Sequence, residues 1–167
     1  MSDTLYDTDF VRWTERQAEA LRQAAREGSN LPIDWENLAE EVEDLGKEIR
    51  HKIESLTGQI LVHLLKLACS PAGRNHPNWM GEVDTFRVRL RKLLDENPAL
   101  RARYAELTQP ELEMSVKLAR REFRRFGEDS ALASLAAWKA RGITPDEVLS
   151  DGLYPVPGTT EMASEDE

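Results

Sequence analysis

The sequence is poor in the residues that carry covalent and metal chemistry. Its 167 residues include one cysteine, Cys69, and three histidines. A single cysteine excludes a disulfide within the chain and is typical of proteins from reducing compartments. Metal sites in helical bundles use Glu-x-x-His motifs on paired helices or two histidines four residues apart, and neither arrangement occurs here. We therefore expect no metal, no cofactor and a cytoplasmic protein.

Long hydrophobic runs are also missing. The most apolar stretch, residues 60–69, is interrupted by His63 and Lys66, whereas a membrane-spanning helix needs about 20 apolar residues. The first ten residues, MSDTLYDTDF, contain neither the basic nor the apolar segment of a signal peptide. With 40% hydrophobic and 32% charged residues, the composition is that of a globular domain. The sequence predicts no membrane segment and no signal peptide.

Basic residues are fewer than acidic ones, 22 against 31, which gives a net charge of −9. The charges are segregated along the chain. Residues 1–58 carry 7 Lys and Arg against 14 Asp and Glu, residues 59–125 carry 13 against 8, and residues 126–167 carry 2 against 9. Attraction between acidic and basic helices inside one bundle is the simplest interpretation, and a partner bound by the basic part is the rival.

One long helical pattern dominates the chain, from Asp34 to about Cys69. Apolar residues recur there in steps of three and four, which defines one side of a helix: Leu38, Val42, Leu45, Ile49, Ile53, Leu56, Ile60, Leu64 and Leu67. Asp34 is a good N-cap. A helix of roughly 35 residues is about 52 Å long, so it is expected to form the centre on which shorter helices pack.

The other elements are shorter. We expect a first helix from about Thr8 to Glu27 capped by Asp7, and further helices at residues 79–96, 99–107, 110–126, 130–141 and 145–149. Asn78 and Pro110 are expected to begin two of them, and Thr144 and Glu147 to form a capping box. The sequence thus predicts one all-α domain over residues 5–155, a bundle of about six helices around the long one, with disordered tails at 1–4 and 156–167.

The order of these elements resembles a bacterial family of uncharacterised all-α proteins, domain of unknown function family twenty-nine. The resemblance covers roughly residues 5–155. It is carried by Tyr6-Asp7, Asp9-Phe10, Trp13, Ile33-Asp34, Asn37-Leu38, Glu40-Glu41-Val42-Glu43, Leu45-Gly46, His63-Leu64-Leu65-Lys66-Leu67, Pro71, Trp79, Glu82 and Arg87. It implies an all-helical fold and a prokaryotic source. The family has no established activity, so the resemblance implies no reaction.

His63 is the sharpest candidate for chemistry, because it lies beside the apolar side of the long helix. If the next helix folds back, His63 comes level with Glu82, and Arg87 follows one turn later. Such a set could make an acid/base or anion-binding pocket, lined also by Lys66 and Trp79. The alternative, which we favour, is a histidine hydrogen-bonded at a helix–helix contact with a purely structural role.

A basic set in the 110–126 helix is the best candidate binding surface: Lys117, Arg120, Arg121, Arg124 and Arg125. Clustered cations can bind phosphates. The chain as a whole is acidic, however, and no helix-turn-helix or aromatic interleaving is present. Pairing with acidic helices or an acidic protein is therefore the preferred interpretation, and nucleic acid is a weaker one.

Together these patterns favour a non-enzymatic cytoplasmic interaction module that binds an unknown protein partner or a second copy of itself. An enzyme or small-ligand binder using His63, Glu82 and Arg87 is the rival hypothesis. Convergence of these three side chains on an open cavity would support the rival, and their burial in packing would support the structural interpretation.

Overall fold

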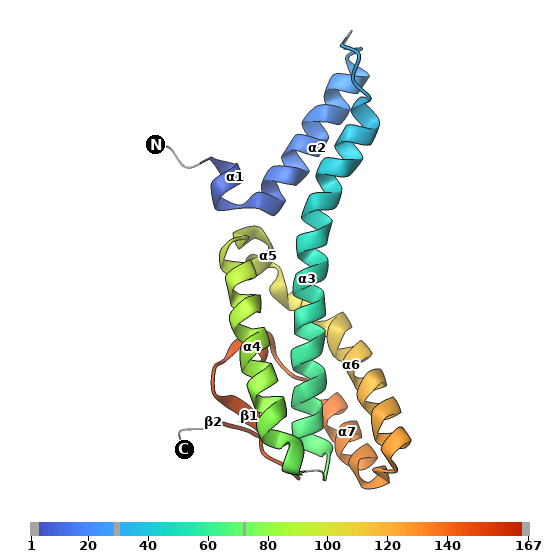
Figure 1. Cartoon of the computed structure of the whole chain (residues 1–167), viewed down its shortest axis with the longest axis vertical. Helices are drawn as coiled ribbons and strands as arrows, with labels where there is room; N and C mark the ends of the chain where they lie inside the picture. Colours follow the sequence, from blue (N-terminus) through green and yellow to red (C-terminus); the bar gives the residue numbers. More distant parts are fainter. Residues whose placement is uncertain (1–3, 29–30, 72, 165–167) are drawn as a thin grey trace. The chain divides into compact units, whose positions relative to one another are not determined.

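The computed structural model describes residues 4–28, 31–71 and 73–164. These residues form helices joined by short connections and one small β-hairpin, which confirms the predicted all-α fold with a long central helix (Figure 1). In chain order the elements are α1 (Leu5–Thr8), α2 (Phe10–Arg26), α3 (Trp35–Cys69), the 3-10 helix η1 (Gly73–Asn75), α4 (His76–Asp95), α5 (Pro98–Ala102), α6 (Tyr104–Phe126), α7 (Asp129–Arg141), α8 (Pro145–Leu149), β1 (Leu153–Pro155) and β2 (Met162–Ser164). In the part of the chain that the structure describes, no helix is both long and apolar enough to cross a membrane.

The long helix α3 has 35 residues and begins where the sequence predicts. The Asp34 carboxylate accepts hydrogen bonds from the backbone N–H of Asn37 at 3.4 Å and from its side-chain amide at 2.6 Å. The chain divides into two compact units, and α3 contributes to both. The first unit comprises Met1–Ile53 with Lys92–Arg103, and the second comprises Glu54–Arg91 with Tyr104–Glu167. The prediction of a single domain stays a prediction.

In the first unit, α2 runs alongside the N-terminal part of α3 (Figure 1). Small residues line the contact: Ala18 and Ala39 are buried, and a Cβ atom at Gly46 would overlap the hydroxyl of the buried Thr14. Glycine therefore lets the two helices approach closely. At the edge of the contact, Arg22 binds Glu43 at 2.5 Å.

Two buried side chains join the starts of α2 and α5 in the first unit. Asp9 caps α2 by accepting the Arg12 N–H at 3.1 Å, and its other oxygen accepts the Ala99 N–H of α5 at 2.8 Å. Asn97 in turn accepts the Val11 N–H at 3.2 Å. Each helix start thus receives a cap from the other, which satisfies N–H groups that would otherwise lack partners. Asp9, and not Asp7, is therefore the cap of α2.

The second unit encloses the C-terminal half of α3 between α4 and α6 (Figure 1). Along this half nearly every apolar side chain is buried, including those of Ile60, Leu61, Leu64, Leu65, Leu67 and Ala68. Val83 and Leu90 of α4 and Leu112, Val116, Ala119 and Phe123 of α6 complete the core. The helix α6 also contacts α7 and α8.

Two helix starts differ from their predictions. The helix α4 begins at His76, because the 3-10 turn leads directly into it and Pro77 is tolerated in a first turn. The helix α6 begins at Tyr104 and contains Pro110, so this proline does not open a helix. It removes one backbone hydrogen bond, and burial of Tyr104 and Leu107 offsets that cost. The Tyr104 hydroxyl also bonds the Thr57 hydroxyl at 2.9 Å.

The C-terminal segment differs as well. Part of the stretch predicted as a disordered tail forms the hairpin of β1 and β2, in which Tyr154 pairs with Ala163. The buried Trp138 of α7 donates its indole N–H to the Thr159 carbonyl at 2.9 Å, and this bond fixes the turn region of the hairpin. Residues 1–3 and 165–167 of the predicted tails lie outside the described residues.

Candidate functional site

His63 and Glu82 form the pair that the sequence predicts. His63 Nε2 lies 2.7 Å from a carboxylate oxygen of Glu82, and the His63 ring meets Phe86 edge-on at 5.8 Å between centroids. One turn further along α3, the Lys66 ammonium lies 4.6 Å from the centre of the Trp79 ring. Because α3 and α4 are antiparallel, the two pairs form successive side-chain contacts between the helices. Four of the five predicted pocket residues are thus brought together.

The hydrogen bonds of His63 limit what it can do. Its Nδ1 lies 2.7 Å from the Gln59 carbonyl, and a carbonyl can only accept, so Nδ1 carries a proton. Its Nε2 faces the Glu82 carboxylate at 2.7 Å. Both nitrogens are engaged, and neither is left for a substrate in this arrangement. This geometry is that of a link between helices.

Arg87 does not belong to this set. It lies five residues after Glu82, about 140° around the helix, and its side chain is fully buried. Its guanidinium donates to the carbonyls of Glu147, Val148 and Leu153 at 2.8–3.0 Å and lies over the Tyr154 ring. Burial lowers the pKa of Arg87 below its usual value. Arg87 therefore fastens α8 and β1 to α4 and does not line a pocket with His63.

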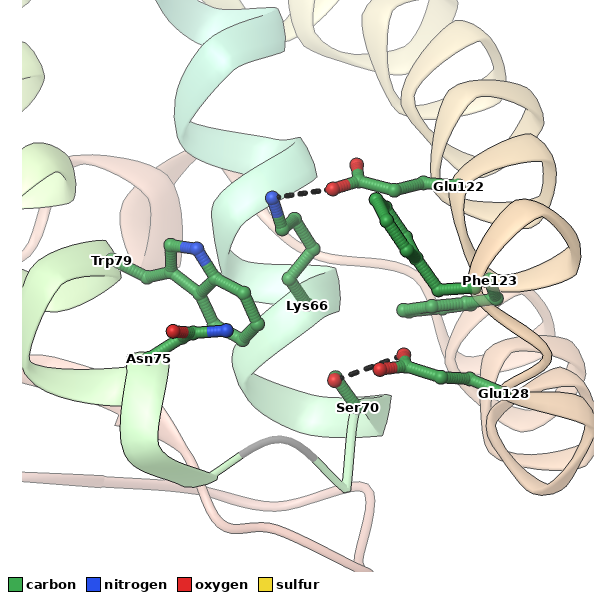
Figure 2. A pocket seen from close by; sticks show the side chains of 8 residues that line it. Lys66, Ser70, Asn75, Trp79, Glu122, Phe123 and Glu128 are labelled. Carbon is green, nitrogen blue, oxygen red and sulfur yellow. Dashed lines mark hydrogen bonds and ion pairs between the residues drawn. The ribbon is translucent and has the colours of Figure 1, made fainter.

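A cavity of about 520 Å³ opens beside the Lys66–Trp79 pair (Figure 2). Trp79 and Asn75 form one wall, and Glu122, Phe123 and Glu128 form the opposite wall. Between them lie Lys66 of α3 and Ser70, which directly follows that helix. The Lys66 ammonium binds Glu122 at 2.8 Å, and the Ser70 hydroxyl donates to Glu128 at 3.0 Å. The exposed ring of Phe126 also lines the cavity.

The cavity combines aromatic rings with two carboxylates and one ammonium group. Its volume lies within the range of small-ligand sites. Lys66 and Trp79 were predicted from the sequence, whereas Glu122 and Glu128 were not. These two lie more than 50 residues from their partners Lys66 and Ser70, and no local pattern marks them. Phe126, the last residue of α6, is 67% exposed.

Cys69 shows no sign of reactivity. It is buried at the end of α3, and burial raises the pKa of its thiol to about 12. A thiol with that pKa is protonated near neutral pH and is a poor nucleophile. Over residues 4–28, 31–71 and 73–164, no three His, Cys, Asp or Glu side chains are placed to hold a metal ion. The expectation of no metal nevertheless stays a prediction.

The outer side of α6 forms the surface we call the α6 face: Met114, Lys117, Leu118, Arg121, Arg124 and Arg125. All six side chains are exposed, with Met114 at 51% and Leu118 at 45%. Arg120, the remaining residue of the predicted basic set, is exposed at the border of this face. The helix buries its opposite side, through Leu112, Val116, Ala119 and Phe123.

Pairing of the α6 cations with acidic helices was one of the two preferred interpretations, and the described residues contain no such ion pair, so pairing with an acidic protein stays a prediction. Among the described residues, none of Lys117, Arg120, Arg121, Arg124 and Arg125 forms an ion pair. Their charge is therefore directed to solvent together with two apolar side chains.

A second uncovered surface lies on the N-terminal half of α3. We call it the α3 seam: Leu38, Val42, Leu45 and Ile49. Leu38 is 40% exposed and Leu45 46% exposed, while Val42 and Ile49 are half-buried. Exposed acidic side chains follow one border of the seam, at Glu41, Asp44 and Glu48. The seam is acidic and apolar, whereas the α6 face is basic and apolar.

Comparison with known proteins assigns the family. The sequence pattern described as domain of unknown function DUF29 matches residues 5–135. The chain belongs to the DUF29 family. The match contains α1 to α6. It therefore includes the α6 face, the α3 seam and the side-chain contacts between α3 and α4. Membership confirms the resemblance seen in the sequence, and it brings no established function.

A solved structure of another protein supports the fold. The chain is similar to the crystal structure of an α-helical protein of unknown function from Rhodospirillum rubrum, with 23% sequence identity and a TM-score of 0.60. The similarity covers 84% of this chain and 98% of the other. At this identity the likeness shows the fold alone. A comparison with curated proteins gives no match.

Proposed function

We propose that this DUF29 protein is a non-enzymatic cytoplasmic interaction module whose α6 face binds an acidic amphipathic helix of a protein partner. The observation that carries the proposal is the composition of the face. Four exposed cations surround Met114 and Leu118, and among the described residues none of these cations has an acidic partner. A surface that combines apolar and unpaired charged side chains suits a helix with acidic flanks and an apolar stripe.

The apolar residues favour a protein partner over nucleic acid. Phosphate binding needs clustered positive charge alone, and exposed Met114 and Leu118 would contribute nothing to it. The net charge of the whole chain, −9, would also repel nucleic acid at a distance. Methionine and arginine, by contrast, are enriched in protein–protein interfaces.

The test uses a fluorescent acidic heptad peptide, with leucine at the a and d positions and glutamate elsewhere, and fluorescence anisotropy with the full chain. We expect binding that weakens at least tenfold in the double variant Arg121→Glu/Arg125→Glu. The matched control is Arg89→Glu/Lys139→Glu, which makes the same charge change at exposed positions outside the α6 face.

Three results would contradict the proposal: no binding of the peptide, equal binding of a scrambled peptide without an apolar stripe, or equal loss in both double variants. Stronger binding of a single-stranded or duplex DNA probe, lost in Arg121→Glu/Arg125→Glu, would favour the nucleic-acid hypothesis instead.

The cavity supports a second candidate function, the binding of a small cationic ligand. Two carboxylates face one ammonium group there, and the rings of Trp79 and Phe126 can stack on a flat cation. Titration with agmatine, followed by isothermal calorimetry, tests this function. We expect heat of binding that is lost in Glu128→Gln and retained in Glu113→Gln, an exposed control on α6. No heat with the unmodified chain would end this candidate.

A further inference from the structure

The acidic helix that fits the α6 face is present in the chain itself. We propose that the α6 face of one copy packs against the α3 seam of a second copy, so that the protein associates head to tail. This inference rests on the proposed function, because it names the partner of the same surface.

The side chains of the α3 seam and of the α6 face follow each other at the same intervals along their helices. The α3 seam places its residues at 38, 42, 45 and 49, and the α6 face places Met114, Leu118, Arg121 and Arg125 at the same four-three-four spacing. Helices with matching steps of four and three interleave their side chains along about three turns. Two apolar residues on α6 can therefore pack between the exposed leucines of α3.

The charges of the two surfaces are also complementary. Glu41, Asp44 and Glu48 border the α3 seam and are exposed. On α6 the cations Lys117, Arg120 and Arg124 occupy the corresponding row, and Glu113 is the exposed acid at the border of that face. Opposite rows of Glu and Arg across an apolar contact give both attraction and register.

The same charges exclude a symmetric contact. Two α3 seams would place acids opposite acids, and two α6 faces would place arginines opposite arginines, which costs free energy at close range. The contact must therefore join two different surfaces. Such a heterologous contact leaves one free seam and one free face on every dimer, so association continues until a ring closes or a chain forms.

The contact is small. Two helices that touch over about three turns bury less than the roughly 1,200–2,000 Å² of a stable interface. We therefore expect weak association, with a dissociation constant in the micromolar range or above. The contact should weaken further with salt because its charged rows are exposed to solvent.

Sedimentation velocity of the full chain at rising concentration tests the proposal. We expect species larger than a dimer at low salt and their loss at 0.5 M NaCl. Two variants each remove one surface: Leu38→Gln/Leu45→Gln removes the seam and Arg121→Glu/Arg125→Glu removes the face. Each should be monomeric alone, with a helical spectrum like that of the unmodified chain. Their equimolar mixture should form a dimer and stop there, since one intact seam and one intact face remain.

A charge exchange gives an independent measurement. Glu41→Arg/Glu48→Arg should abolish association, and combining it with Lys117→Glu/Arg124→Glu in one chain should restore it. The control for both experiments is Val88→Gln/Arg89→Glu, which changes an exposed apolar residue and an exposed cation on α4 and should leave association unchanged.

Four outcomes would overturn the inference: a monomer at all concentrations, a mixture of the two variants that stays monomeric, the same loss in the control, or a contact whose extent does not change with concentration. If the acidic peptide binds the α6 face while the chain stays monomeric, the inference fails and the proposed function stands. If neither peptide binding nor self-association occurs, both fail.

Discussion

The two halves of α3 have nearly the same apolar spacing and very different surroundings. In the N-terminal half, Leu38 and Leu45 remain 40% and 46% exposed, and the contact with α2 uses Ala39 and Gly46 on another side of the helix. In the C-terminal half, Ile60, Leu61, Leu64 and Leu65 are fully buried. The same periodicity therefore serves a narrow two-helix contact in one unit and an enclosed core in the other.

The two halves of α3 differ in the residues that flank the apolar stripe. Residues 60–68 are apolar on several sides of the helix, so more than one neighbouring helix can cover them. Around Leu38 and Leu45 the other positions are mostly acidic, and only one side carries small residues. A narrow stripe beside charges is typical of a helix that meets one further helix, and this is the basis of the proposed contact with α6 of a second copy.

The largest effect is expected where the enclosed unit depends on a buried charge. Arg87→Ala removes the donor to three carbonyl groups and leaves a cavity. We expect the free energy of unfolding to fall by about 3–5 kcal/mol, because three carbonyl groups lose a charged donor and a buried side chain is removed. Urea denaturation measures the change. Arg89→Ala, an exposed position on the same helix, should change stability by no more than about 0.5 kcal/mol.

If Arg87→Ala and Arg89→Ala had equal effects, the guanidinium would not be an anchor of α8 and β1. The two units would then differ only in the extent to which their apolar side chains are buried.

The next effect concerns the close contact in the first unit. Gly46→Ala introduces a Cβ atom that overlaps the Thr14 hydroxyl, which itself donates to the Val11 carbonyl at 2.7 Å. The helices must separate or the hydrogen bond must break, and we expect a loss of about 1–3 kcal/mol. Thermal unfolding followed by circular dichroism measures it.

Two other glycines within helices provide the matched controls. At Gly58 a Cβ would approach the Glu111 carboxylate to 2.8 Å, and that flexible side chain can move, so Gly58→Ala should be nearly neutral. At Gly81 there is open space, and Gly81→Ala should stabilise by about 0.5–1 kcal/mol through helix propensity. A Gly46→Ala protein as stable as Gly81→Ala would show that α2 does not pack closely on α3.

A smaller effect is expected for His63. His63→Ala removes the contact with Glu82 and the edge contact with Phe86. Glu82 is largely exposed, so we expect a loss of only about 1 kcal/mol and a melting temperature lower by a few degrees. Binding of the acidic peptide should be unchanged. The exposed His51→Ala is the control. A loss of ligand binding without loss of stability would favour the rival hypothesis of a functional pocket.

The smallest effect is a pH dependence at α8. Arg141 holds the pKa of Glu147 below its usual value of 4.5. The folded state therefore favours the charged carboxylate, and the resulting stability is present above pH 4.5 and is lost as the pH falls through the lowered pKa. Glu147→Gln keeps a capping side chain and removes the charge. We expect a deficit below about 1 kcal/mol at pH 7 that shrinks as the pH falls below 4.5 in chemical denaturation. A deficit independent of pH would contradict this origin.

The local parts of the fold could be predicted from the sequence. The bounds of α3 follow from its periodicity and from Asp34, and α8 follows from the capping box of Thr144 and Glu147, whose hydrogen bonds the structure contains. The His63–Glu82 pair was also predictable, because two antiparallel helices joined by a short turn place these positions level. Such features depend on residues within one or two turns of each other or on one simple connection.

Other features depend on contacts between distant parts of the chain, and no local pattern marks them. Asp9 caps both its own helix and α5, 90 residues away. Pro110 was expected to open a helix, whereas tertiary burial of Tyr104 and Leu107 extends α6 past it. Arg87 was placed with the His63–Glu82 pair because it follows Glu82 closely in sequence, although the helical rotation directs its side chain to α8.

The sequence by itself determined the all-α class, the length of α3 and the segregation of acidic and basic charge, because periodicity, caps and composition are properties of short segments. Only the tertiary structure decided which apolar side chains are covered. It buried the C-terminal half of α3, left the α3 seam and the α6 face exposed, and enclosed Arg87 among three carbonyl groups. Burial depends on the match between surfaces far apart in the chain, and periodicity alone does not contain that match.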